Sequence, residues 1–232
     1  MKNWLWRWTW RACVVVLGML FLFEGWIFAH VLWWNWFNPS ASAFMEQRLE
    51  IMHDQNPGAR LRHQWVPYDK ISLNLKRGLI AAEDANFLEH EGFDWDAIQK
   101  AYEKNLKKGK VVAGGSTISQ QLAKNLFLSG RRTPARKLEE AIITVMIEAV
   151  MSKRRIFEIY LNIIEWGNGV FGAEAASRYY FKKSAANLDA WEAARLAAMV
   201  PKPRYYDRNR DTPWLDKKTN LVLERMPSAQ VP

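Results

Sequence analysis

An apolar segment near the N-terminus constrains this chain of 232 residues more than any other feature. Residues 12–34, ACVVVLGMLFLFEGWIFAHVLWW, are apolar apart from Glu24 and His30. A helix rises about 1.5 Å per residue, so this segment is long enough to span the roughly 30 Å of hydrocarbon in a bilayer. We therefore predict a single transmembrane helix over residues 12–34.

The charges on either side of this segment predict its orientation. Lys2, Arg7 and Arg11 precede it, whereas the first Lys or Arg after it is Arg48. Since cationic residues stay on the cytoplasmic side, we predict that residues 1–11 form a cytoplasmic N-terminus and that the bulk of the chain lies outside.

The tryptophans favour a retained anchor over a cleaved signal peptide. Eight of the 13 tryptophans fall in the first 36 residues, mostly at the two ends of the segment, where indole rings settle at headgroup level. Residues 41–43, Ala-Ser-Ala, resemble a cleavage site, but the apolar run is longer than that of a signal peptide. Glu24, near mid-span, indicates either contact with another membrane protein or a neutral carboxyl group on a lone anchor.

The rest of the chain has the size and composition of one folded domain. Of the net charge of +9, the first 36 residues carry +2, which leaves +7 for the rest. Hydrophobic residues make up 49% and charged residues 25%, which excludes a disordered chain. Cys13 is the single cysteine, so the fold has no internal disulfide. We divide this part into a connector (35–64), a domain (65–205) and a C-terminal tail (206–232).

Helical signals dominate this domain. Ser72 and Asp94 are candidate N-caps, and Thr133 followed by Pro134 is a further start signal. Strand signals are weak and no period of 20–50 residues repeats, so we expect a mainly α fold, with an irregular stretch after Pro201. The predicted helices are 44–52, one from Ser72 that carries Leu75 to Phe87, one from Asp94 to Leu106, one from Ser116 or Thr117 to Leu128, and 134–151, 156–164, 173–180 and 188–199.

Glu83 is the first candidate for chemistry. It lies three residues after Ile80 and four before Phe87, at the edge of the apolar helix face. Burial raises the pKa of a carboxyl group, and a Glu with a raised pKa suits general acid–base catalysis. A buried Glu paired with an Arg explains the same spacing, so both interpretations stay open. Asp84 and His90 add polar groups, but the chain has no HExxH or CxxC pattern, which leaves only a loosely held divalent ion.

Residues 114–125, GGSTISQQLAKN, form a second candidate site. The glycines and hydroxyl side chains precede a predicted helix N-terminus, whose free N–H groups can bind an anion such as phosphate. Thr117, Gln121, Lys124 and Asn125 share one stripe of this helix, which is either a site lining or a solvated face. It is not a Walker loop, because no Gly-Lys-Ser/Thr follows at the required spacing.

A third cluster combines cations with a carboxylate. Arg136 and Lys137 lie four and three residues before Glu140, a spacing that fits either an intrahelical ion pair or a group that handles a pyrophosphate. Residues 153–155, Lys-Arg-Arg, add cations suited to anionic lipid or substrate.

Taken in order, these segments resemble the five motifs of the peptidoglycan glycosyltransferases, glycosyltransferase family 51. The resemblance covers about residues 65–205, and five matches in order are not expected by chance. The motifs are EDANFLEHEG at 83–92, GGSTISQQLAKN at 114–125, RKLEE at 136–140, KRRIFEIYLN at 153–162, and GVFGAEAA at 169–176 with YYF at 179–181.

The resemblance implies a lysozyme-like, mainly α-helical glycosyltransferase domain behind a single transmembrane helix, in the inner membrane of a bacterium with the catalytic domain in the periplasm. It implies that lipid II is polymerised into β-1,4-linked glycan with release of undecaprenyl pyrophosphate. Glu83 would be the general base for the acceptor's 4-hydroxyl. Glu140 would be the second carboxylate, near the donor's pyrophosphate. The implied substrate contacts are Asp84, Phe87, His90, Gly115, Ser116, Thr117, Gln120, Gln121, Lys124, Asn125, Arg136, Lys137, Lys153 and Asn162.

The same resemblance implies the partners and bounds the activity. The partners would be lipid II, the growing glycan strand, membrane lipids, and division or elongation proteins that meet the transmembrane helix. No cofactor is required, although Mg²⁺ or Mn²⁺ could be held near Glu140. Glu165 stands where many two-domain relatives have an aromatic residue, so no role is carried onto it. Nothing after Pro201 resembles a transpeptidase domain, and cross-linking is not predicted.

Two other classes of protein are weighed against this one. A lysozyme or lytic transglycosylase also uses one Glu on a helical fold, but it needs no cations such as Lys124, Arg136 and Lys137. A non-catalytic scaffold or nucleic-acid binder would account for the charge of +9. The predicted outside location and the few aromatics among the basic runs argue against nucleic acid.

Overall fold

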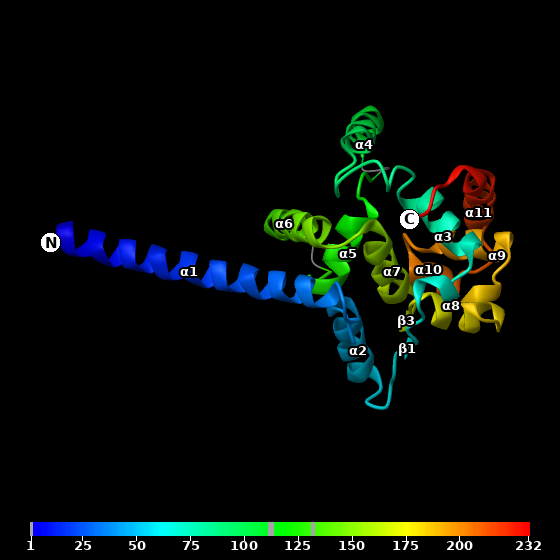
Figure 1. The fold of residues 1–232 in the computed structure, drawn as a ribbon, viewed down its shortest axis with the longest axis horizontal. Coiled ribbons are helices and arrows are strands. Elements are labelled where there is room, and N and C mark those ends of the chain that lie inside the picture. Colours follow the sequence, from blue (N-terminus) through cyan, green and yellow to red (C-terminus); the bar gives the residue numbers. More distant parts are fainter. Residues whose placement is uncertain (1, 111–113, 131–132) are drawn as a thin grey trace. The chain divides into compact units, whose positions relative to one another are not determined.

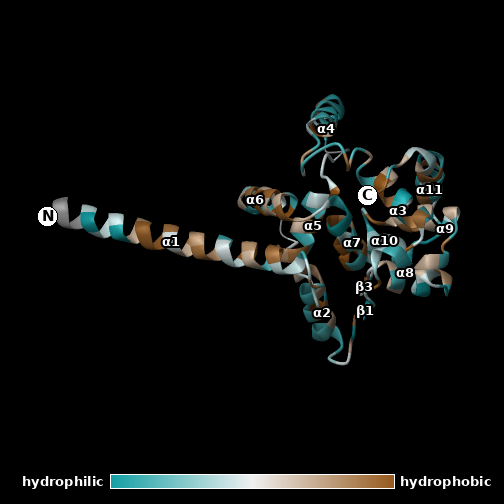
Figure 2. Cartoon of the chain, viewed as in Figure 1, coloured by the Kyte–Doolittle hydropathy of each residue, from teal (hydrophilic) through white to brown (hydrophobic). Residues whose placement is uncertain are grey.

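The computed structural model describes residues 2–110, 114–130 and 133–232, and the chain divides into two compact units, Met1–Asn38 and Pro39–Pro232. The first unit contains helix α1, Lys2–Trp34. Within α1, Trp6–Trp34 is long and apolar enough to cross a membrane, and it is the one such helix among the described residues. Figure 2 shows the concentration of apolar residues along α1.

The second unit is mainly α-helical, as predicted, and its elements are drawn in Figure 1. The helices are α2 (Ala43–Gln55), α3 (Leu73–Glu83), α4 (Trp95–Lys108), α5 (Ile118–Phe127), α6 (Pro134–Val150), α7 (Lys153–Ile163), α8 (Ala173–Phe181), α9 (Ala190–Met199), α10 (Pro203–Arg208) and α11 (Pro213–Arg225). Short 3₁₀ turns are η1 (Tyr68–Lys70), η2 (Ala185–Asn187) and η3 (Met226–Ser228).

The predicted start signals act as helix caps. Ser72, Asp94 and Thr133 each accept a hydrogen bond from a backbone N–H of the first turn, and Pro134 opens α6. Of the two predicted starts, Thr117 rather than Ser116 caps α5, and its side chain and that of Gln120 form a reciprocal capping box.

Several helix ends differ from the prediction, and three of them are explained by their caps. Helix α3 stops at Glu83, because Asp84 leaves the helical conformation. Helix α7 begins at Lys153 rather than at residue 156, since Ser152 supplies the cap. Helix α9 begins two residues later than predicted, after the cap Asp189. The first of these differences matters for function, because it leaves Glu83 as the last helical residue.

A small three-stranded sheet lies beside α8 and α10. Its strands are β1 (Arg62–His63), β2 (Glu165–Gly167) and β3 (Val170–Phe171), in the order β1-β3-β2. Strand β3 is parallel to β1 and antiparallel to β2. Gly172, directly after β3, has φ +83°, and a Cβ there would lie 2.6 Å from the carbonyl oxygen of Asn162, so this contact with α7 requires glycine.

The expectation of an irregular tail after Pro201 is wrong. Pro203 and Pro213 each stand in the first turn of a helix, where proline lacks only an N–H that has no intrahelical partner. Helix α11 packs against α9 and α3, and Leu215, Thr219 and Val222 are its buried residues. Figure 1 shows α3, α9 and α11 gathered together, whereas α5, α6 and α7 form a second group.

We predict that replacing Leu215 with Ala lowers the free energy of unfolding by about 2–5 kcal/mol, because the deletion leaves a cavity between α11 and its neighbours. Leu215 has no exposed surface, whereas Leu221 on the same helix is 42% exposed. Denaturant unfolding in detergent measures both variants. Equal, small changes for Leu215→Ala and Leu221→Ala would mean that α11 is not part of the core.

Candidate active site

Glu83 is a nearly buried carboxylate that contacts two other helices. Its side chain is 10% exposed, and its Oε2 accepts a hydrogen bond of 2.9 Å from Gln121 Nε2 on α5. Its Oε1 lies 3.9 Å from Lys218 Nζ on α11. Burial raises the pKa of Glu83 above its ordinary value, while Lys218, Gln121 and Lys124 act in the opposite direction. A carboxylate whose pKa is raised by burial accepts a proton more readily than an exposed glutamate does.

Tyr160 fixes the amide that faces Glu83. Tyr160, on α7, is fully buried, and its hydroxyl donates a hydrogen bond of 3.0 Å to Gln121 Oε1. An ionised carboxylate can only accept hydrogen bonds, so the amide nitrogen of Gln121 faces Glu83 and its oxygen faces Tyr160. The three side chains thus form one chain of hydrogen bonds from α7 to the end of α3.

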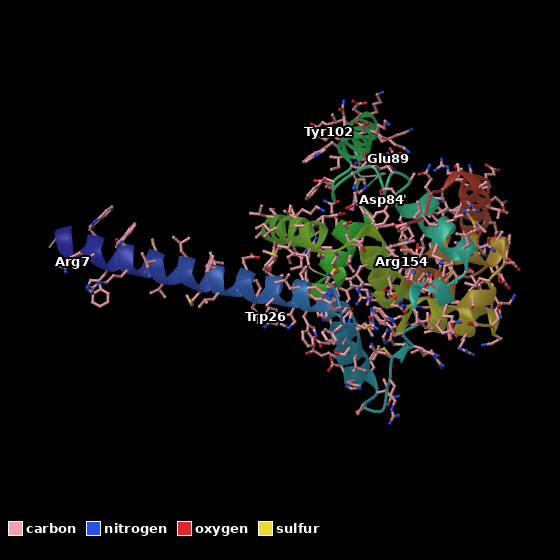
Figure 3. All side chains as sticks on the ribbon, in the orientation of Figure 1. Arg7, Trp26, Asp84, Glu89, Tyr102 and Arg154 are labelled. Carbon is pink, nitrogen blue, oxygen red and sulfur yellow. The ribbon has the colours of Figure 1, made fainter. Side chains whose placement is uncertain are left out.

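Asp84 ties the end of α3 to the start of α5 (Asp84 is labelled in Figure 3). Its Oδ2 accepts a hydrogen bond of 2.9 Å from the backbone N–H of Ile118, and its Oδ1 lies 3.0 Å from His90 Nε2. His90 Nδ1 in turn accepts from the backbone N–H of Gly92. A carboxylate at a helix N-terminus is stabilised by the helix dipole. Asp84 and His90, predicted to bind substrate, use these polar atoms to hold the first motif against the second.

Four other residues predicted to bind substrate are occupied in packing. Phe87 is fully buried against Phe157, with ring centroids 5.7 Å apart. Lys153 donates hydrogen bonds to His90 O (2.5 Å) and to Glu148 Oε1 (2.8 Å).

Asn162 is fully buried, with its amide bonded to both backbone groups of Val66. A Cβ on Gly115 would lie 2.8 Å from Ile98 Cα. The backbone at this position approaches α4 so closely that glycine is required. These contacts give Phe87, Lys153, Asn162 and Gly115 a structural role, and their contact with substrate stays a prediction.

A large cavity is lined by cations and polar groups from α5 and α6. Its volume is about 720 Å³. Of the predicted substrate contacts and carboxylates, the lining includes Ser116, Gln120, Gln121, Lys124, Asn125, Arg136, Lys137 and Glu140. Thr117 lines instead a smaller cavity of about 240 Å³, together with Gly115, Glu83, Asp84 and Arg225. The structure thus brings most of the predicted site residues of the second and third motifs to one cavity.

The charges in the large cavity favour an anionic ligand. Arg136 Nη1 is 2.9 Å from Glu140 Oε2, and Lys137 pairs with the other oxygen of Glu140, as their spacing predicted. None of the ion pairs found among the described residues includes Lys124. Burial lowers the pKa of Lys124, and Glu140 opposes this shift. A half-buried ammonium group without a close carboxylate is suited to a phosphate oxygen.

Glu165 also lines this cavity and was assigned no role from the sequence. It is buried between Arg48 Nε at 3.4 Å and Arg204 Nε at 3.1 Å. Burial raises its pKa to about 7, and Arg48 opposes the shift. No local signal identifies this cluster, because Arg48, Glu165 and Arg204 come from three distant parts of the chain.

A divalent ion near Glu140 finds few protein ligands. Both oxygens of Glu140 are engaged by cations, and the described residues contain no group of three or more His, Cys, Asp or Glu that could hold a metal ion. These residues do not fit a site in which the protein alone holds Mg²⁺ or Mn²⁺. The expectation that no cofactor is required stays a prediction.

Comparison with known families decides what kind of site this is. Residues 50–227 match the family model described as Transglycosylase. The chain belongs to the transglycosylase family. A biosynthetic peptidoglycan transglycosylase from Nitrosospira multiformis is 64% identical to this transglycosylase over 226 residues, which cover 97% of this chain and 98% of the relative. Proteins of the same name from Methylobacillus flagellatus and Chromobacterium violaceum are 63% and 60% identical, over 96% of this chain and 97% of each relative.

These matches confirm the family and the fold class that the five motifs indicated. The matched region extends beyond residues 65–205 at both ends and includes the C-terminal part of α2, residues 50–55, and all of α11. That extent agrees with the packing of α11 against α3 and α9. The role of each site residue stays a prediction, which the variants below test.

We predict that Lys124→Met weakens the binding of inorganic pyrophosphate at least tenfold, because a hydrogen bond to a charged group contributes about 1.5–3 kcal/mol. Isothermal titration calorimetry on the detergent-solubilised chain measures the affinity. Lys104→Met, an exposed lysine on α4, is the matched control and should bind as the parent does. Equal affinity in the two variants would contradict the anion-binding role of Lys124.

Proposed function

We propose that this transglycosylase polymerises lipid II, a disaccharide-peptide carried on undecaprenyl pyrophosphate, into β-1,4-linked glycan for the bacterial cell wall. The proposal rests on one juxtaposition. Glu83 and the cations of the large cavity are joined by a single turn of α5, because Gln121 binds Glu83 and also lines that cavity, and Lys124 follows it by three residues. The relatives are named biosynthetic peptidoglycan transglycosylases, which agrees with glycan synthesis.

The two halves of the site suit the two ends of one displacement. In the proposed step Glu83 takes the proton from the 4-hydroxyl of the acceptor sugar, and the oxygen attacks the anomeric carbon of the donor. The bond from that carbon to the phosphate oxygen breaks, and its electron pair leaves with undecaprenyl pyrophosphate. An α-linked donor then gives a β-linked product by inversion, so no covalent sugar–enzyme intermediate is formed.

Cations in the large cavity would stabilise the leaving group. Negative charge develops on the pyrophosphate as the bond breaks, and preorganised cations at that point lower the barrier. Lys124 is free of a close carboxylate among the described residues, whereas Arg136 and Lys137 are oriented by Glu140. In this proposal Glu140 acts as the carboxylate that holds the two cations toward the donor. Gln121 and Asn125 would hydrogen-bond the sugar or phosphate from the same wall.

We predict that Glu83→Gln lowers the rate of lipid II polymerisation at least about 100-fold, because the amide cannot accept the proton and a general base contributes roughly 10²–10⁴ in rate. Glycan formation is measured on the full chain in detergent or lipid, with circular dichroism as the check on folding. Glu89→Gln, an exposed residue of the same motif that is labelled in Figure 3, is the control and should remain active.

Two outcomes would count against this function. Polymerisation that survives in Glu83→Gln would remove the base assignment. Release of soluble fragments from finished cell wall, without consumption of lipid II, would favour the glycan-cleaving enzymes that share a single Glu on a helical fold.

We also propose that the chain lies in the bacterial inner membrane with its N-terminus in the cytoplasm and its catalytic domain in the periplasm. Helix α1 is consistent with a membrane anchor, and Arg7 and Arg11 precede its most apolar part. The domain would then face its lipid-linked substrate, the growing glycan and the membrane lipids. Division or elongation proteins that meet the transmembrane helix, at Glu24 for example, remain a prediction.

We predict that alkaline phosphatase, which folds only outside the cytoplasm, is active when fused after Pro232 and inactive when fused before Met1. Enzyme activity in whole cells measures both fusions against equal amounts of protein. The reversed pattern would overturn the orientation, and activity of both fusions would contradict a retained single span.

A further inference from the structure

Lys218 is a buried cation that the proposed reaction leaves without a role. It lies on α11, in the part of the chain that was expected to be irregular. Its side chain is 19% exposed, and its Nζ lies 3.9 Å from Glu83 Oε1. This separation is too long for a hydrogen bond, so the contact is electrostatic.

The position of Lys218 on its helix makes the contact unusual. Leu215, Thr219 and Val222 are the buried residues of α11, and residue 218 follows the first by three and precedes the last by four. Lys218 therefore lies on or beside the stripe with which α11 packs against α3, where an aliphatic side chain would be the ordinary choice. Burial lowers the pKa of Lys218, and Glu83 opposes that shift. Burial of a charged lysine costs free energy, and the negative charge of Glu83 offsets part of that cost.

The other groups that face Glu83 differ from Lys218 in kind or distance. Gln121 and Lys124 belong to α5, and Tyr160 belongs to α7. Gln121 is neutral, Lys124 is influenced more by the charge of Glu140 than by that of Glu83, and the adjacent Asp84 is an acid that disfavours ionisation of Glu83. Arg225 lines the same small cavity as Glu83. Within the described residues, Lys218 is the cation that lies within ion-pair distance of Glu83.

We propose that Lys218 is a positioning residue that keeps Glu83 ionised and turned toward Gln121, so that the base is ready to accept the acceptor's proton. The inference rests on the proposed function of Glu83 as general base. Lys218 acts through Glu83 and is given no contact with the sugar or the pyrophosphate. The two partners of Glu83 divide its oxygens, because Gln121 binds Oε2 and Lys218 faces Oε1.

The sign of the effect on pH dependence follows directly. A general base must be deprotonated, so activity rises with pH through the pKa of Glu83. Removal of a nearby positive charge disfavours the carboxylate and raises that pKa further. Loss of Lys218 therefore moves the acidic limb of the pH–activity profile to higher pH, and activity returns above the new limb.

The experiment compares kcat/KM for lipid II polymerisation between pH 5 and 9 in the full chain and in Lys218→Met. We expect the acidic limb of the variant to shift upward by about one pH unit or more, with roughly tenfold lower kcat/KM below the limb and recovery at high pH. Lys218→Arg should restore the parent profile, since it keeps the charge. Lys217→Met removes the same charge from the adjacent, exposed position and should leave the profile unchanged.

Other results would overturn the inference. A Lys218→Met profile that superimposes on that of Lys217→Met would remove the role, and a uniform loss at every pH in a folded variant would make Lys218 merely structural. If Lys218→Met does not fold, Lys218→Gln takes its place with the same expected shift.

A second measurement separates this inference from the proposed function. The infrared carboxyl band that disappears in Glu83→Gln reports the protonation of Glu83 without any lipid II. It should titrate at higher pH in Lys218→Met than in Lys217→Met, and equal titration would refute the role of Lys218. A parent protein that forms no glycan at any pH would refute the proposed function, whereas the infrared shift would still establish the contact.

Discussion

The hydrogen bond from the backbone N–H of Ile118 to Asp84 is the interaction on which the site depends. It joins the residue after α3 to the first turn of α5, at a helix end where a carboxylate is favoured by the dipole. Glu83 precedes Asp84, and Gln121 follows Ile118 by three residues. One carboxylate therefore brings the candidate base and the amide that binds it within 2.9 Å of each other.

The electrostatics of the site follow from how deeply these groups are buried. Desolvation raises the pKa of Glu83 and lowers the pKa of Lys124 and Lys218, so each group is moved toward neutrality. The opposite charges around them limit these shifts, because burial also strengthens the attraction between unlike charges. The result is an acceptor of protons on one side of α5 and a cationic cavity of about 720 Å³ on the other.

The five motifs turn out to contain two kinds of residue. Gln121 binds Glu83, and both Gln121 and Lys124 line the large cavity. Asn162 and Phe87, in contrast, are fully buried and stabilise the packing of the domain. Sequence alone could not separate these kinds, because both are polar or aromatic residues at fixed places within a motif. The separation requires knowing which atoms are already engaged, and those partners lie tens of residues away along the chain.

Local chemistry determined much of this protein. The apolar run of α1, the caps Ser72, Asp94 and Thr117, and the spacing of Arg136 to Glu140 are all effects between residues within one or two helical turns, and they are legible in the sequence. The tertiary structure alone decided that α11 is a helix of the core and that Lys218 lies 3.9 Å from Glu83. That contact joins residues 135 positions apart, and no helical period or capping rule carries information over such a distance.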